Sequence, residues 1–555
     1  MGLKYFGRAQ YKFSQMNTDR EMEIRLVGFL MLLLILAACN GRTQPTPPTE
    51  QLPTPITEAL TPTTEAPTAV STSTNTPQNQ TSILPAPTLF DNAWDDRDIF
   101  RANLVSAEQP VLDTLTDTAV YHIDIEISSP SQINGTQEVR YTNQSNDALD
   151  RLYFHQFPNQ LGGTMTISNV RLNGQAVDAL DEGDVMQIPL AEPLQPGEQV
   201  VVAMDFVTEV PTGETSTKYN VLAFAENILA LAHFYPMIAT YQEESGWHIE
   251  PSPPNGDETF AESSLYLVKV SAPSDLVMAA SGTAVDEQEN GDQQTITYAA
   301  GPARDFFLAA STDYVVNSKQ VGDVRINSYT PANLQNGSTA AIATAAAALQ
   351  TFEESFSPYP YSEFDIVSTP TTALGIEYPG IIANNINIFN IDTESSSGTP
   401  NSILLESTTA HEVAHQWFYN MVGNDQLNEP WLDEALTQYA TMLYYADQYG
   451  QEGFDAYYAS LDGRWARVDY AEIPVGMPAG DYNGAEYGAI VYGRGPIFVD
   501  ELAKQMGTET FTTFMQDYNQ SYRWQIATTQ DFKELAEFHC DCDLSDLFNT
   551  WVFAN

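Results

Sequence analysis

The sequence has few cysteines and few basic residues. It contains three cysteines in 555 residues, too few for a disulfide framework, so the core must depend on burial of apolar side chains. Lysine and arginine together number 22 against 73 aspartates and glutamates, giving a net charge of −51. A field of this sign repels phosphate backbones and argues against nucleic-acid binding. Hydrophobic residues make up 43% of the chain, which excludes wholesale disorder.

The apolar run near the amino terminus is too short to span a bilayer comfortably. Leu26–Ala38 follows Arg25 and contains no charged residue, whereas a spanning helix needs about 17–25 residues. The run fits the apolar region of a signal peptide. It ends in Leu36-Ala37-Ala38-Cys39, which resembles a bacterial lipobox, in which a peptidase cuts before the cysteine and the cysteine is acylated. We therefore expect residues 1–38 to be a lipoprotein-type signal peptide and Cys39 to be lipidated.

An ordinary signal peptide with an incidental cysteine is the alternative, and Met16 or Met22 is an open choice of start. Thr43–Thr88 is rich in proline, threonine, serine and glutamine and lacks the apolar content needed to offset the entropy of ordering. We expect residues 39–95 to form the lipidated cysteine and a disordered stalk. The protein would then be extracytoplasmic, anchored by its lipid to a bacterial membrane.

Two regions of different periodicity follow the stalk. Val120–Val316 shows short alternating runs separated by turn signals such as Asn134-Gly135, the pattern of antiparallel β-structure. After about residue 330 the periodicity becomes helical, as in Ala340–Phe356. We predict an α+β chain with an antiparallel β-sandwich or saddle domain over 110–325 and a mainly helical domain over 326–555.

The segment His411-Glu412-Val413-Ala414-His415 carries the sharpest chemical signal. Residues four apart in a helix leave the same face one turn apart, so both imidazoles can bind one metal ion. The spacing is typical of a zinc site in which the glutamate is directed towards a water on the same metal. The alternative is an ordinary helix that carries two histidines by chance.

A candidate third ligand, Glu434, follows nineteen positions after His415. We expect it just over one turn inside a second helix that a short loop turns back to face the first. Two neutral imidazoles and one carboxylate leave a tetrahedral zinc with its fourth position open for water, which is the catalytic arrangement. The neighbouring Asp433 points about 100° away around the helix and is the weaker candidate.

This combination resembles a known family. H-E-x-x-H followed after eighteen residues by Glu is similar to the membrane alanyl aminopeptidase (aminopeptidase N) family of gluzincin zinc metallopeptidases. Trp417 and Trp431-Leu432-Asp433-Glu434-Ala435 resemble the family's tryptophan and its W-L-N-E-G stretch, with Asp and Ala in place of Asn and Gly. The resemblance implies a thermolysin-like catalytic domain over 326–555 and one Zn²⁺ per chain. Many relatives continue into a helical C-terminal domain, so we expect a short form with a more open cleft.

Upstream, Leu374-Gly375-Ile376-Glu377-Tyr378-Pro379 resembles the family's G-x-M-E-N exopeptidase motif, with Leu and Ile in place of Gly and Met. In the family this glutamate binds the substrate's free α-amine, and the adjacent backbone pairs with the peptide. The resemblance therefore assigns substrate binding to Glu377, Gly375 and Ile376. A carboxylate near the metal would attract an ammonium group and place the first peptide bond over zinc. A surface carboxylate is the alternative for Glu377.

Two further similarities concern a tyrosine and a second amine ligand. Tyr492-Gly493-Arg494-Gly495 resembles the family's Y-x-K-G segment, whose tyrosine hydroxyl stabilises the oxyanion, and Tyr487 is the nearest competitor. Relatives often contribute a second amine-binding Glu or Gln from the β-domain, shortly before an aromatic-Pro pair. Phe234-Tyr235-Pro236 is similar to that pair, which makes Glu226 or Asn227 the nearest candidate.

We therefore expect a zinc peptidase that removes amino-terminal residues from peptides with a free amino terminus. Glu412 and Tyr492 would be catalytic, with His411, His415 and Glu434 as metal ligands. One alternative is a zinc endopeptidase or dipeptidyl-type peptidase on the same scaffold. Another is a non-catalytic stalked binding module, against which the presence of both Glu412 and Tyr492 argues. Residue preference, natural peptides, oligomeric state and the redox state of Cys540 and Cys542 stay open.

Overall fold

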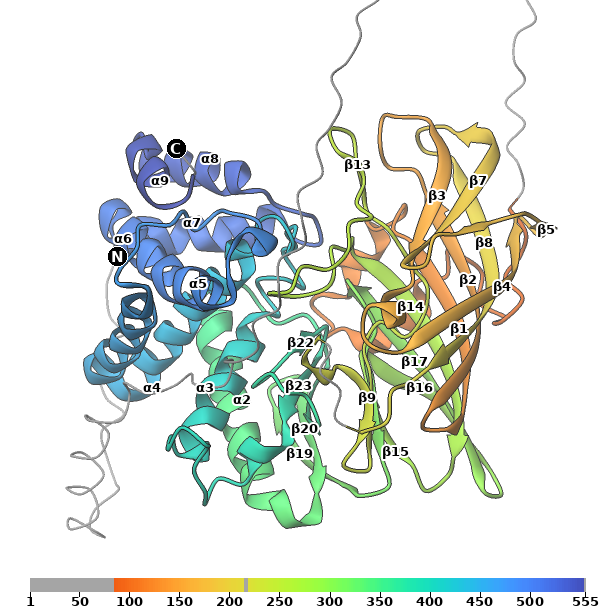
Figure 1. The fold of residues 1–555 in the computed structure, drawn as a ribbon, viewed down its shortest axis with the longest axis horizontal. Coiled ribbons are helices and arrows are strands. Elements are labelled where there is room, and N and C mark those ends of the chain that lie inside the picture. The colour runs from red at the N-terminus through yellow and green to blue at the C-terminus, as the bar shows by residue number, and fades with distance from the viewer. Residues whose placement is uncertain (1–83, 214–217, 554–555) are drawn as a thin grey trace, which may run out of the picture.

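The fold is given by a computed structural model that describes residues 84–213 and 218–553. The predicted signal peptide, Cys39 and the stalk up to residue 83 lie outside these residues. The expected α+β class is confirmed: a part rich in β-sheet comes first and a mainly helical part follows, and the two lie side by side (Figure 1). Among the described residues, no helix has the length and apolar character needed to cross a bilayer.

The first part is built on a large sheet with the strand order β16-β17-β14-β1-β2-β8-β4-β5. Its pairs are antiparallel except β1 with β14, which are parallel. The strands are β1 (Val120–Ser129), β2 (Gln132–Thr142), β4 (Thr164–Leu172), β5 (Gln175–Ala176), β8 (Gln199–Glu209), β14 (Ser264–Pro273), β16 (Thr283–Asn290) and β17 (Gln293–Ala303). Alternating apolar side chains bury one face, as Ile123 and Ile125 do on β1.

Three small sheets complete this part, with the orders β15-β18-β10-β9, β11-β3-β7-β6 and β12-β13. Their strands are β3 (Leu149–His155), β6 (Leu180–Asp181), β7 (Val185–Leu194), β9 (Leu222–Ala225), β10 (Ile228–Leu231), β11 (Met237–Ile238), β12 (Tyr241–Gln242), β13 (Gly246–Trp247), β15 (Val277–Ala280) and β18 (Leu308–Ser311). Their buried apolar residues are continuous with the core of the large sheet.

A further sheet belongs to the second part and has the order β19-β20-β21-β23-β22. Its strands are β19 (Tyr314–Val321), β20 (Val324–Pro331), β21 (Glu363–Thr369), β22 (Glu377–Tyr378) and β23 (Ile381–Asn385). Because β19 and β20 join this sheet, the second part begins between Ser311 and Tyr314, earlier than the expected boundary at 325/326. The alternation of β19 and β20 resembles that of the preceding strands, so the sequence pattern alone did not separate them.

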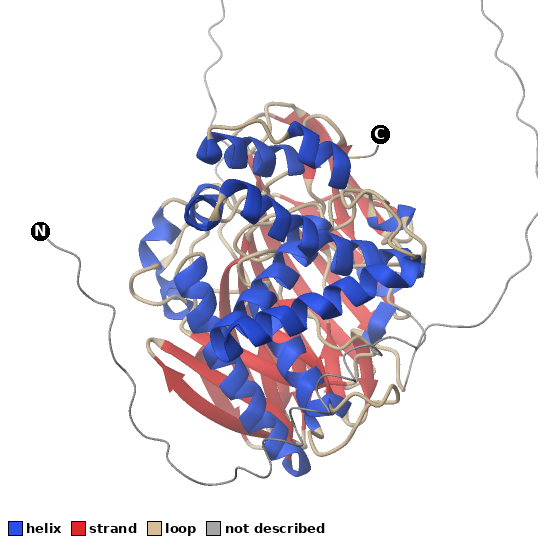
Figure 2. Ribbon diagram, turned by 90° about the vertical axis from the view of Figure 1, so that its left-hand side faces the viewer, coloured by secondary structure: helices blue, strands red, loops and turns tan. Residues whose placement is uncertain are grey.

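The helices of the second part form the outer layer in Figure 2. They are α2 (Gln335–Ser355), α3 (Asn401–Ala414), α4 (Trp431–Trp465), α5 (Gly484–Ala489), α6 (Gly495–Met506), α7 (Thr508–Ser521), α8 (Thr529–Cys540) and α9 (Ser545–Trp551). The helix expected over Ala340–Phe356 is α2, which begins five residues earlier. Cys540, the last residue of α8, is joined to Cys542 in a disulfide, whereas the sequence left the redox state of these two cysteines open.

The last part of the predicted stalk is ordered. Trp94 is buried and stacks on His122 of β1 with ring centroids 4.5 Å apart, and Phe90 packs edge-on against the same imidazole. The hydroxyl of Thr88 donates to the Glu138 carboxylate at 2.6 Å. The expectation of disorder over 39–95 is therefore wrong for residues 84–95, because two aromatic side chains find a binding surface on the sheet that composition cannot reveal.

A buried arginine fastens the two parts together. Arg304, just after β17, is 2% exposed and donates to the backbone carbonyls of Ala261 at 3.0 Å and Gln525 at 2.7 Å. Its guanidinium lies so close to Gly423 that a Cβ there would meet it. These bonds tie the β-rich part to the loops around the helical part and fix the orientation of the surfaces between them.

We predict that His122 makes stability depend on pH. Burial lowers its pKa to about 4, so between pH 6.5 and 4 the unfolded chain binds a proton that the folded chain does not. Stability is then complete above pH 6.5 and falls as the pH drops towards 4. The loss from this residue is about 2 kcal/mol at pH 5. Urea unfolding at pH 7.5 and 5.0 measures how much unfolding free energy each protein loses between the two pH values. The loss should be smaller for His122→Phe than for the wild type by about this amount. Equal losses in the two proteins would contradict the assignment.

Candidate metal centre

The two histidines of the H-E-x-x-H segment face one point at the end of α3. The helix ends at Ala414, and His415 follows it with helical backbone angles. The Nε2 atoms of His411 and His415 are 3.2 Å apart. His415 is 1% exposed, and its Nδ1 lies 3.0 Å from the carbonyl oxygen of Phe418. That contact assigns the proton to Nδ1 and leaves the Nε2 lone pair free for a metal.

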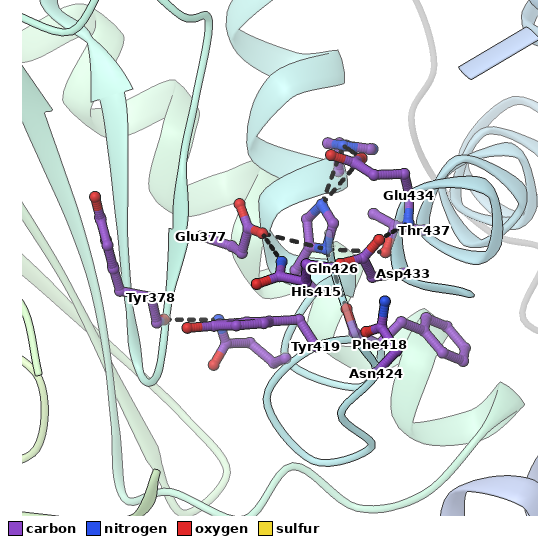
Figure 3. Close-up of polar contacts among 12 residues, drawn as sticks. Glu377, Tyr378, His415, Phe418, Tyr419, Asn424, Gln426, Asp433, Glu434 and Thr437 are labelled. Carbon is purple, nitrogen blue, oxygen red and sulfur yellow. Dashed lines mark hydrogen bonds and ion pairs between the residues drawn. The ribbon is translucent and has the colours of Figure 1, made fainter. Parts of the chain in front are cut away.

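Glu434 approaches the same point from α4, in the fourth position of that helix. Its Oε2 lies 3.3 Å from His411 Nε2 and 3.5 Å from His415 Nε2, and the contact with His415 appears in Figure 3. The helix start is held by Trp431, which is fully buried and donates from Nε1 to the Thr529 hydroxyl at 2.9 Å. Asp433 points elsewhere and accepts from the Glu434 amide, as the helical geometry predicted.

This arrangement fits zinc. Two ligand atoms about 2.0–2.1 Å from one tetrahedral zinc lie roughly 3.3 Å apart, close to the three separations found here. Oε2 of Glu434 is buried without a hydrogen-bond donor, so its lone pairs are directed at the same point. Although burial opposes it, contact with His411 and His415 keeps the pKa of Glu434 well below its usual range. The carboxylate is therefore charged and ready to bind a cation.

The three side chains line a cavity of about 300 Å³ between the two parts of the chain. Glu412 also lines it, and burial raises the pKa of this carboxyl to about 8. Gly375 lies against Glu412, and a Cβ at that position would come within 2.5 Å of its Oε1. The absence of a side chain at Gly375 therefore leaves the Glu412 carboxylate room in its present position beside the ligands.

The segment around Gly375 presents one free edge to the cavity. Ile376 exchanges two backbone hydrogen bonds with Ala383, at 2.9 and 3.0 Å, and β22 is the last strand of its sheet. Because backbone groups alternate along a strand, those of Gly375 point away from β23. Leu374, where the family has glycine, lines the cavity while 42% exposed.

Glu377 belongs to a group of carboxylates at one end of the cavity. Atoms of Asp257, Glu377 and Asp433 lie within 4.8 Å of one another, and Glu377 Oε1 lies 3.9 Å from His415 Nδ1. Gln426 donates to Glu377 at 3.4 Å, as Figure 3 shows. Burial, and then the charge of Asp257, raise the pKa of Glu377. Mutual repulsion of this kind is relieved by a bound cation.

The two candidates for a second amine ligand lie away from the cavity. Glu226 and Asn227 form the exposed turn between β9 and β10, and the side chain of Asn227 donates to Asp313 at 2.8 Å. Neither residue lines the cavity, so both candidates are wrong. Asp257, in the loop before β14, lines it instead. No spacing rule singled it out among many acidic loop residues, because its position depends on how the two parts of the chain meet.

Tyr492 reaches the metal ligands, whereas Arg494 does not. The Tyr492 hydroxyl donates to Glu434, and Tyr487 packs edge-on against the Tyr492 ring. Arg494 is 1% exposed and donates to the carbonyls of Thr550 and Trp551. Its charge therefore fastens α9 to the domain, and the basic position of the motif is structural in this chain.

Comparisons with known proteins agree with this geometry. Residues 340–551 match the family described as "Peptidase family M1 domain". The chain is 26% identical over 297 residues to Aminopeptidase M1-B of Oryza sativa subsp. japonica, covering 52% of this chain and 34% of that protein. It is 24% identical over 347 residues to Aminopeptidase 2 of Candida albicans, covering 58% and 37%. The chain thus spans about a third of the length of these curated relatives.

Solved structures show the same fold over more of the chain. The M1 zinc metallopeptidase from Deinococcus radiodurans superposes with a TM-score of 0.59 at 18% identity, covering 79% of this chain and 94% of that one. A mutant of that enzyme bound to a Tyr-Ser-Ala substrate gives a TM-score of 0.58 with the same coverage. The resemblance drawn from the His411, His415 and Glu434 spacing is borne out over residues 340–551, which match the peptidase family M1 domain.

Proposed function

We propose that the protein is a zinc-dependent aminopeptidase that hydrolyses the first peptide bond of peptides with a free amino terminus. One observation carries the proposal. A single cavity contains the three metal ligands, the carboxylate of Glu412, and a group of carboxylates beside His415 that suits an ammonium ion. The first two features serve peptide hydrolysis in general, and the third selects the amino terminus.

The amine-binding group consists of Asp257 and Glu377, supported by Gln426 and Asp433. A substrate ammonium would neutralise the repulsion between these carboxylates and donate charge-assisted hydrogen bonds to them. The amine would then lie next to the ligand His415, with the first carbonyl at the metal. An internal stretch of peptide offers no positive charge to this group and would have to desolvate it without compensation. The site therefore favours an aminopeptidase over an endopeptidase.

The residues of the chain divide the reaction between them. Zinc, when bound by His411, His415 and Glu434, supplies a Lewis acid that activates water and polarises the scissile carbonyl. Glu412 accepts the proton of the attacking water and returns a proton to the leaving amine. The Tyr492 hydroxyl donates to the oxyanion that develops at the carbonyl, an interaction commonly worth about 3–4 kcal/mol. The free edge of Gly375 aligns the peptide backbone.

We expect one zinc per chain, held mainly by Glu434 and the two histidines. Glu434→Gln removes the negative charge of the ligand set and should weaken zinc binding about a hundredfold or more. Asp433→Asn is a matched control, since it changes the adjacent residue in the same way outside the ligand set. Competition with a zinc chelator and metal analysis measure both effects. If the wild type bound two zinc ions per chain and Asp433→Asn bound only one, this assignment would be contradicted.

The reaction is tested with one peptide in free and N-acetylated forms. A soluble form of the protein that starts at residue 84, so that it keeps the ordered segment 84–95, is loaded with zinc, and the fragments are identified by mass. We expect stepwise removal of residues from the free form only, and complete loss of cleavage in Glu412→Gln. Asp257→Asn should raise KM about tenfold or more by removing one charge from the amine group. Cleavage of the acetylated peptide at a comparable rate would exclude the amine anchor while keeping the hydrolytic centre.

The membrane location rests on the sequence of the leader. We propose that Cys39 is lipidated and anchors the chain to the outside of a bacterial membrane, with residues 40–83 as the connecting stalk. The full chain produced in a lipoprotein-processing bacterium should partition into the membrane fraction, and Cys39→Ala should release it. Retention of the variant in the membrane fraction would rule out the lipid anchor.

A further inference from the structure

One positive side chain lines a cavity that is otherwise acidic. The lining carboxylates are Asp257, Glu377, Glu412 and Glu434. Arg464 is the only lysine or arginine among the described residues that line it, and its side chain is half-buried. The amine group and the hydrolytic centre account for the carboxylates, but neither uses a guanidinium.

The chain reverses direction within α4, and this reversal brings Arg464 back towards the metal ligands. At Gly450 the backbone takes a positive φ of 67°, and the chain folds back on itself. Tyr457 stacks on Tyr445 with ring centroids 4.9 Å apart and donates to Gln438 at 2.7 Å. This antiparallel return brings Arg464 level with the start of α4, where Glu434 lies.

The return is packed closely against the segment that carries Tyr492. A Cβ at Gly493 would lie 2.9 Å from the Trp465 amide nitrogen and 3.0 Å from Arg464 Cβ. A guanidinium nitrogen of Arg464 donates to the Tyr492 carbonyl at 3.3 Å. Tyr492 therefore contacts Arg464 through its backbone and Glu434 through its hydroxyl, which fixes Arg464 beside the hydrolytic centre.

Within the described residues, Arg464 has no carboxylate partner. No ion pair within 4.0 Å includes it, whereas Arg101, Arg325 and Lys504 all have one. The Tyr492 carbonyl accepts one of the five hydrogen bonds that a guanidinium can donate. Although the chain has 73 acidic residues and 22 basic ones, the guanidinium of Arg464 has no carboxylate within ion-pair distance among the described residues. An anionic ligand would supply the missing partner.

The two charges lie at opposite ends of the ligand pair. Glu377 is 3.9 Å from His415. Arg464 donates to the backbone of Tyr492, whose ring centroid lies 6.1 Å from that of His411, one helical turn earlier in α3. An extended peptide with its amine at Glu377 would pass the metal and direct its leaving fragment towards Arg464. The cavity volume of about 300 Å³ is at the small end of ligand pockets, roughly 300–1,000 Å³. It therefore suits a short peptide.

We propose that Arg464 binds the C-terminal α-carboxylate of the leaving fragment, so that the enzyme prefers dipeptides and tripeptides with a free carboxyl terminus. The inference rests on the proposed function, because it takes the orientation of the peptide from the amine anchor. It adds a substrate class: short peptides held at both ends. An acidic side chain on the leaving fragment offers the same carboxylate chemistry and is the source to be distinguished.

Binding to a non-cleaving protein tests this inference independently of activity. Zinc-loaded Glu412→Gln is titrated by calorimetry with Ala-Ala and Ala-Ala-Ala, each as the free acid and as the C-terminal amide. The free acids should bind about ten- to a hundredfold more tightly than the amides, the range for a hydrogen-bonded charge pair. The preference should fall to less than threefold when Arg464→Gln is added.

Two further variants separate the charge from structural effects. Arg464→Lys on the same background should keep part of the preference, because the charge remains. Arg467→Gln makes the same charge change three residues along, outside the cavity lining, and should keep the full preference. Equal binding of acid and amide by Glu412→Gln would overturn the proposal, as would an undiminished preference after Arg464→Gln.

The source of the carboxylate and the proposed function are tested in separate arms. If Ala-Glu-amide binds as tightly as Ala-Ala and much more tightly than Ala-Gln-amide, an acidic side chain replaces the carboxyl terminus as the ligand, which overturns the proposal. The wild-type enzyme is assayed in parallel, and the free acids should show a lower KM than the C-terminal amides. If it cleaves no peptide while the binding preference depends on Arg464, the carboxylate site stands and the aminopeptidase assignment fails.

Discussion

The structure depends on holding three electron-rich atoms against one another in a buried place. Nε2 of His411, Nε2 of His415 and Oε2 of Glu434 lie 3.2–3.5 Å apart, and no basic side chain is inserted between them. Such an arrangement is unfavourable without a cation, so packing must impose it. The buried start of α4 at Trp431 and the bond from His415 to the Phe418 carbonyl supply that rigidity.

Close approach of backbone is the second means by which the site is built. Gly375 lets the edge strand lie against the Glu412 carboxylate, and Gly493 lets the end of α4 lie against the segment that carries Tyr492. Gly450 permits the reversal that brings Arg464 back. Each glycine sits where a side chain would clash or a positive φ is needed, and together they shape the small cavity around the metal ligands.

Charge is distributed by function within a strongly acidic protein. The overall negative field keeps the protein soluble and attracts cationic groups, and the cavity concentrates this tendency at Asp257 and Glu377 beside His415. Arg464 contributes a positive charge at the other end of the cavity. A zwitterionic short peptide matches this order of charges, which gives the cavity a direction as well as a size.

What the sequence determined by itself is mostly local. The spacing of His411 and His415 is set by one turn of helix, and the β and helical periodicities identified the fold class. The position of Glu434 in a second helix followed from its spacing after His415, and the family resemblance added Glu377 and Tyr492; the structure brings all three to the cavity. Only the tertiary structure decided that Asp257 rather than Glu226 or Asn227 lines the cavity, that residues 84–95 are ordered, that Arg494 is structural and that Arg464 lines the cavity. These depend on contacts between residues that are 28 positions apart, as Arg464 and Tyr492 are, to 120 positions apart, as Asp257 and Glu377 are. Packing rather than spacing along the chain determines which of these side chains meet.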